Sequence, residues 1–204
     1  MNAKELVSNV KSLPPASPGA MRLIQLLNHG SADNDEIIEG LRTDAVLTAK
    51  LLRACNSSVF AFEESISSVD QALLMLGHQE VLRIVLALAC GGMLAVPLPG
   101  YAVAANELWF HSLVTASAAE VVVNSGFNLV ADRSVAFTAG LLHDIGKLVL
   151  GQVLTEDLQG RIRASIQQDR LSEAEAEKLV LGTDHAEVGA CLLQKWSLPD
   201  DLVG

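Results

Sequence analysis

The segment Gly140–Leu148 places an adjacent histidine and aspartate inside an otherwise apolar run with helical spacing. An imidazole and a carboxylate are costly to bury without partners, so the core must offer His143 and Asp144 something to bind. A divalent metal ion fits, because mixed nitrogen and oxygen donors suit Zn, Mn, Fe or Mg. A buried polar cluster, in which Asp144 accepts from His143 or from helix amides, fits the pair equally well.

A lysine follows the pair at helical spacing. Lys147 lies three residues after Asp144, and residues at this spacing project from the same face of a helix. An ammonium group beside a metal-binding carboxylate is suited to hold a phosphate group. We therefore predict that Lys147 contacts phosphate if the site is catalytic.

Helical periodicity dominates the chain, and no segment shows a convincing alternating pattern of a strand. We predict an all-α, two-lobed protein with an internal boundary at Pro97, Pro99 and Gly100. The expected helices cover approximately residues 21–27, 37–41, 43–56, 72–76, 78–93, 102–124, 132–151, 156–168, 172–181 and 184–196.

Several residues have the spacing of helix caps. Thr43 is a candidate N-cap, and Ser68 with Gln71 and Asp184 with Glu187 have capping-box spacing. The acidic run at 173–178 carries no evident chemistry, so we interpret it as a solvated helix face and not as a cation site.

Charge and hydropathy exclude several classes of protein. The formal net charge of −10 argues against a general nucleic-acid or anionic-membrane surface. Residues 1–13 are polar and do not resemble a secretory signal, and the longest apolar run covers only residues 84–96. Cys55, Cys90 and Cys191 are widely spaced and odd in number, which is typical of buried thiols in a reducing compartment. We expect a cytoplasmic protein with no membrane partner.

Two of the five histidines are expected to be peripheral. His29 lies at a helix end and His78 at a helix start, where surface or capping roles account for both. His111 lies in the middle of a helix that should pack in the core, where a hydrogen-bonded histidine is commoner than a ligand.

His185 lies in the first turn of the last expected helix, and can point into a cleft at the helix end or form a surface hydrogen bond. Gly189, four residues on, would let a neighbouring segment approach that face closely. His111, His143 and His185 therefore lie on separate helices of the second lobe, and metal sites in helical bundles are assembled in this way. We predict that His111, His143 and Asp144 converge within a few ångströms, with His185 nearby.

The order of His111 and then His143–Asp144 within LLHDIGKL resembles the HD superfamily of metal-dependent phosphohydrolases. The two lobes together resemble the HDOD domain, the HD-related output domain of bacterial signalling proteins. The matching segments are 13–28, 43–60 and 66–89 in the first lobe, and 107–116, 139–150 and 183–200 in the second.

The resemblance implies one HDOD-like domain over residues 13–204, with an N-terminal helical lobe at 13–97 and an HD-like lobe at 98–204. It also implies that His111, His143 and Asp144 hold a divalent metal, together with a later aspartate. Relatives of the HD-GYP type, which hydrolyse cyclic di-GMP, add a histidine in a context like HAEVGACLL.

That histidine corresponds to His185, and Lys147 matches their phosphate-side lysine. These relatives also have a downstream His-His pair and a final aspartate. The sequence ends at Gly204 before these could occur, so we expect an HD-like lobe truncated at its C-terminus or lacking its last helices.

Two functions follow from the resemblance. The first is a signal-transduction output module with a degenerate or incomplete HD site, no enzymatic activity and a signalling protein as partner. In this case the divalent metal (Mn, Fe, Mg or Zn) is optional. The alternative is a metal-dependent phosphohydrolase acting on a nucleotide or cyclic dinucleotide, in which the metal would lower the pKa of a bound water.

Overall fold

The computed structural model describes residues 1–9, 39, 41, 44–60, 62, 64–125, 133–196, 198 and 200–203. These residues are mostly helical, and the β-type pairing found among them is one isolated bridge between Leu98 and Val103. The prediction of an all-α fold is confirmed. Two compact units divide the chain: one comprises residues 15–93, and the other comprises residues 1–14 and 94–204.

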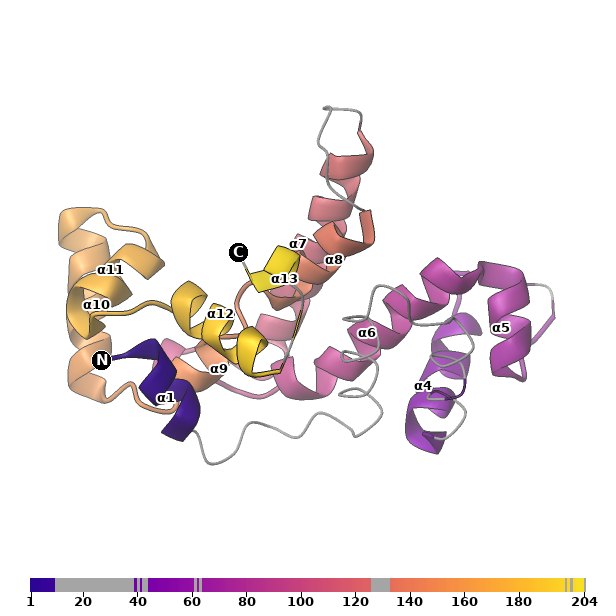
Figure 1. Ribbon diagram of the computed structural model, residues 1–204, viewed down its shortest axis with the longest axis horizontal. Helices are drawn as coiled ribbons and strands as arrows, with labels where there is room; N and C mark the ends of the chain where they lie inside the picture. Colours follow the sequence, from indigo (N-terminus) through magenta and orange to yellow (C-terminus); the bar gives the residue numbers. More distant parts are fainter. Residues whose placement is uncertain are drawn as a thin grey trace. The chain divides into compact units, whose positions relative to one another are not determined.

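The first unit contains helices built around an aliphatic core. They are α4 (Ala45–Cys55), α5 (Val69–Leu76) and α6 (His78–Leu94) (Figure 1). Ser68 caps α5 by accepting from the amide of Gln71, as the spacing predicts. The N-cap of α4 is Asp44 and not Thr43: the Asp44 carboxylate accepts from the amides of Val46 and Leu47. Thr43 lies outside the described residues, as do the helices expected at 21–27 and across most of 37–41.

The second unit carries the His-Asp pair. Its elements are α1 (Ala3–Asn9), η1 (Pro99–Tyr101), α7 (Glu107–Asn124), α8 (Arg133–Leu142), α9 (Lys147–Leu150), α10 (Glu156–Asp169), α11 (Glu173–Leu181), α12 (His185–Lys195) and α13 (Asp200–Val203). The sequence did not predict α1, because its composition is polar. This helix packs against α12 and α9, and Lys195 Nζ donates to the backbone oxygen of Val7 at 2.9 Å.

The prediction of one continuous helix over 132–151 is wrong at its centre. Helix α8 ends at Leu142 and α9 begins at Lys147, and the residues between them form a turn. In this turn the amides of Ile145 and Lys147 donate to carbonyls only three residues back, so the helix tightens before it restarts. The His-Asp pair is therefore presented at the end of a helix and not from its side.

Glycine packing explains why the chain turns there. A Cβ atom on Gly146 would lie 1.9 Å from the carbonyl oxygen of His185 and 2.6 Å from the amide nitrogen of Gly189. The turn therefore packs backbone to backbone on the first turn of α12. Gly140 makes a similar contact with α7, where a Cβ would lie 2.7 Å from Ala116 Cα. These two contacts bring α7, α8 and α12 to one place.

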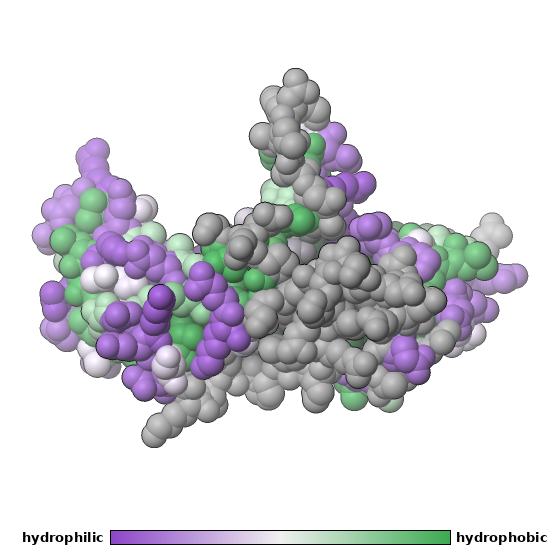
Figure 2. Space-filling view, viewed as in Figure 1, coloured by the Kyte–Doolittle hydropathy of each residue, from purple (hydrophilic) through white to green (hydrophobic). Residues whose placement is uncertain are grey.

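Part of the surface of the second unit is strongly hydrophilic, in keeping with the formal net charge of −10. Hydrophilic side chains gather over α10 and α11 in the view of Figure 2. Among the described helices, none is both long and apolar enough to cross a membrane.

Cys55 and Cys90 are buried free thiols, and burial raises the pKa of Cys90 to about 12, which makes this thiol unreactive. His78 is exposed at the start of α6, as predicted.

Replacing Gly146 with alanine should destabilise the second unit. The added Cβ meets backbone atoms that cannot move aside cheaply, so we expect a loss of about 1–3 kcal/mol in the free energy of unfolding. Gly160→Ala is the matched control, because nothing lies within 4 Å of its Cβ position in α10. It should stabilise by about 0.5–1 kcal/mol. Urea denaturation measures both, and equal stabilities for the two variants would contradict the packing described.

Candidate metal centre

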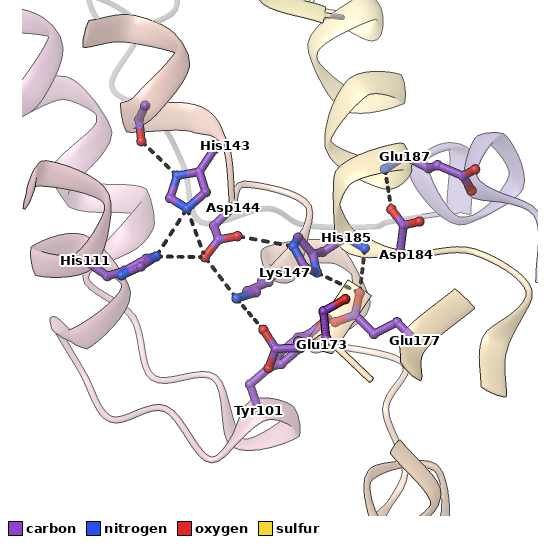
Figure 3. Close-up of polar contacts among 12 residues, drawn as sticks. Tyr101, His111, His143, Asp144, Lys147, Glu173, Glu177, Asp184, His185 and Glu187 are labelled. Atoms are coloured by element: carbon purple, nitrogen blue, oxygen red, sulfur yellow. Dashed lines mark hydrogen bonds and ion pairs between the residues drawn. The ribbon is translucent and has the colours of Figure 1, made fainter. Parts of the chain in front are cut away.

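Three side chains from two segments converge on one point. His111 extends from α7, and His143 and Asp144 come from the turn after α8 (Figure 3). His111 Nε2 lies 3.2 Å from His143 Nε2 and 3.4 Å from Asp144 Oδ2. His143 Nε2 lies 3.5 Å from the same Oδ2 atom. The close packing of Gly140 on Ala116 permits this convergence, because it holds α8 against α7.

The ring of His143 is oriented by the backbone. Its Nδ1 atom lies 2.8 Å from the carbonyl oxygen of Gly140. Since a carbonyl oxygen only accepts, this contact requires the proton to be on Nδ1. The Nε2 lone pair of a neutral His143 then faces His111 and Asp144, which is the orientation that a metal ligand needs.

The spacing of the three donor atoms fits a metal ion. With bonds of about 2.1 Å, neighbouring ligands are about 3.4 Å apart around a tetrahedral ion and about 3.0 Å apart around an octahedral one. The three separations of 3.2, 3.4 and 3.5 Å fall at or near these edge lengths. His111, His143 and Asp144 could therefore hold one divalent metal with little rearrangement.

His185 approaches the opposite oxygen of the same carboxylate. Its Nε2 atom lies 3.4 Å from Asp144 Oδ1, whereas His111 and His143 face Oδ2. The contact of Gly146 with the first turn of α12 brings His185 to this position. The sequence-predicted residues His111, His143, Asp144 and His185 therefore meet around one carboxylate.

Lys147 neutralises part of the charge at the site. Its Nζ atom lies 2.9 Å from Asp144 Oδ2 and 2.6 Å from Glu173 Oε2, and 5.7 Å from the centre of the Tyr101 ring. Burial alone would raise the pKa of Asp144, but the hydrogen bond and charge of Lys147 hold it below its ordinary value. Burial would lower the pKa of Lys147, and the bonds to Glu173 and Asp144 raise it instead.

The interpretation of the acidic run at 173–178 as a solvated face is wrong for Glu177, whose side chain is 0 % exposed and bonded to His185. Glu173 is 41 % exposed, as in a solvated face, but it also pairs with Lys147. Tyr101, which donates to Glu177 from η1, also went unpredicted. The sequence held one signal for the burial of Glu177. The apolar residue Leu181 lies four positions later, on the same face of the helix, and the structure shows that this face is the inner one.

The cluster opens to solvent on one side. The side chain of His111 is 58 % exposed and that of His143 is 35 % exposed, whereas Asp144 is only 4 % exposed. The expectation that His111 packs in the core is therefore wrong: this face of α7 is not covered by the described residues. A small molecule can reach the imidazoles from solvent while the carboxylate stays enclosed.

A profile of the HDOD domain matches residues 13–204, so the chain belongs to the HDOD domain family. Solved relatives share the fold. An HDOD domain protein of unknown function from Geobacter sulfurreducens is 26 % identical, with a TM-score of 0.71 over 98 % of this chain and 66 % of its own. A protein from Shewanella amazonensis SB2B with a provisional phosphohydrolase name is 27 % identical, with a TM-score of 0.71 over 97 % of this chain and 68 % of its own.

A curated relative, an uncharacterized protein of Treponema pallidum, is 20 % identical over 98 % of this chain. The chain spans only 38 % of the length of that relative and about two thirds of each solved one. Family membership therefore describes the domain, and the activity of the longer proteins does not follow from it.

Asp144→Asn should destabilise the metal-free protein by about 1–3 kcal/mol, because Lys147 and the imidazoles lose a buried charged acceptor. The folded-state pKa of Asp144 is lowered, so its stabilising contribution is present above the ordinary carboxyl pKa and is lost as pH falls through the folded value. The difference from wild type should therefore shrink in acid.

Denaturation in a chelator over a range of pH measures this difference. Asp169→Asn, at an exposed site near the end of α10, is the control and should have little effect. A difference between wild type and Asp144→Asn that stays constant or grows in acid would contradict the assigned charge state.

Proposed function

We propose that this chain is a bacterial, cytoplasmic signal-transduction output module of the HDOD type, which acts without turning over a substrate. Its His-Asp cluster binds at most one divalent metal ion, and a signalling protein is its partner. Membership of the HDOD domain family supports the general class. The charge pairing around Asp144 supports the absence of turnover.

The proposal rests on one observation: the carboxylates near Asp144 are already paired with other side chains of the protein. Asp144 is the one carboxylate grouped with His111 and His143 in the described part of the chain. Glu173 pairs with Lys147, and Glu177 is bonded to His185. A two-metal hydrolytic site needs a ligand set for each ion, with the ions about 3.5–4 Å apart. Among the described residues, His111, His143 and Asp144 form one such set. A second group, Glu173, Glu177 and His185, also lies close enough together to hold an ion, but its two carboxylates are the ones paired with Lys147 and His185.

Lys147 and a bound metal ion would compete for Asp144, and this competition would give the domain two states. Lys147 occupies Oδ2, the oxygen that a metal held by His111 and His143 would also use. Binding of an ion would therefore weaken the bond from Lys147. Since the turn holding Asp144 packs on the backbone of α12, a change at the carboxylate is passed to that helix.

A second candidate function is a metal-dependent phosphohydrolase acting on a nucleotide or cyclic dinucleotide. Solvent access to His111 and His143 favours it, because substrate and water could reach a bound ion. Lys147 would then bind the phosphate group. The provisional phosphohydrolase name of the relative from Shewanella amazonensis also favours it.

Elemental analysis and a hydrolysis assay separate the two functions. The protein is reconstituted with Mn, Fe or Zn, freed of loose metal and assayed with bis(p-nitrophenyl) phosphate and a cyclic dinucleotide. We expect no more than one tightly held metal ion per chain, loss of this ion in His143→Ala, and no metal-dependent hydrolysis.

His78→Ala is the control, because this histidine is exposed on α6 outside the cluster. It should retain the metal content of the wild type. Hydrolysis that depends on metal and disappears in His143→Ala would establish the phosphohydrolase instead. Metal retained in full by His143→Ala would contradict the assignment of the site.

A further inference from the structure

Glu177 is a buried acid that the cluster itself does not use as a ligand. Its side chain is 0 % exposed, and a buried carboxylate is costly unless its oxygens accept hydrogen bonds. Three donors meet this need. Tyr101 donates its hydroxyl to Oε1 at 2.8 Å, and Oε2 lies 2.7 Å from both the amide nitrogen and the Nδ1 atom of His185.

The contact with Nδ1 determines which nitrogen of His185 carries the proton. An ionised carboxylate only accepts, so Nδ1 must be protonated. The other ring nitrogen, Nε2, is then the atom that faces Asp144 Oδ1 at 3.4 Å (Figure 3). Metal-binding histidines usually donate their second ring N–H to a carboxylate or carbonyl, which fixes the tautomer and the ring orientation.

We propose that Glu177 is a positioning residue of the cluster: it fixes His185 as the Nδ1–H tautomer. The Nε2 lone pair then faces Asp144 Oδ1 and serves as a further ligand of the same single ion when the carboxylate binds that ion through both oxygens. This inference rests on the metal site of the proposed function and extends it to a residue that does not touch the ion. His143 is oriented by a backbone carbonyl, so Glu177 supplies for His185 what Gly140 supplies for His143.

The same carboxylate also fixes the backbone beneath the ring. The amide of His185 opens α12, and the first amides of a helix lack partners within that helix. Because Oε2 receives both this amide and Nδ1, the ring and its backbone are held by one atom. Tyr101 holds the other oxygen, Oε1, and so prevents the carboxylate from rotating away.

The tautomer of His185 can be measured directly in the wild-type protein. Long-range proton–nitrogen correlation spectra of the ¹⁵N-labelled, metal-free protein distinguish the two tautomers at a pH where the ring is neutral. Loss of the signal in His185→Gln gives the assignment. We expect Nδ1 to carry the proton, and a ring protonated on Nε2 would overturn the inference whether or not metal binds.

Metal affinity tests the consequence. Zinc binding is followed by calorimetry in Glu177→Gln and in Glu175→Gln. Glu175 lies on the same helix but is exposed in the capping box with Ser172, and glutamine can keep that role. We expect zinc to bind Glu177→Gln about ten- to a hundredfold more weakly than wild type, and Glu175→Gln to match wild type.

Tyr101→Phe is the second variant, because it keeps the His185 contact and removes only the bond to Oε1. It should weaken zinc binding by less than Glu177→Gln does. Wild-type affinity in a folded Glu177→Gln protein would overturn the inference. A wild-type protein that binds no zinc would instead refute the proposed metal site. If Glu177→Gln does not fold, the wild-type tautomer and Tyr101→Phe still decide the question.

Discussion

The second unit of this protein is organised around one buried carboxylate. Asp144 is almost fully enclosed, yet it lies beside an ammonium group and three imidazoles drawn from α7, α12 and the turn itself. A charge in such a position persists only if its partners are held in place by the fold. The arrangement of α7, α12 and the turn therefore has to pair the buried charge of Asp144 as well as pack apolar side chains.

Close backbone packing delivers those partners. Gly140 lets α8 lie on α7 at Ala116, and Gly146 lets the turn lie on α12 beside Gly189. Any side chain at these glycines would push apart the segments that carry the imidazoles. The two glycines thus permit the backbone contacts that bring the candidate metal ligands together. The contact at Gly146 also joins the turn that carries Asp144 to α12.

Much of this site could be predicted from the sequence, since histidines and an aspartate in an apolar helical context must find partners. The turn after α8 could not, because apolar spacing continues through it and the break depends on contact with α12. The burial of Glu177 was hard to predict from the sequence for a related reason. Its neighbours Glu173 and Glu175 make the segment look solvated, and the apolar Leu181 four residues later is the one feature of the sequence that points to the inner face of α11.

We propose that His111, His143 and Asp144 form a site for a single divalent ion. Titration of the metal-free protein with Co²⁺, followed by its visible absorption, tests this most directly. We expect d–d bands of nitrogen and oxygen coordination that saturate at one equivalent and are absent in Asp144→Asn. Saturation at two equivalents, or a spectrum identical to that of Co²⁺ in buffer, would contradict it.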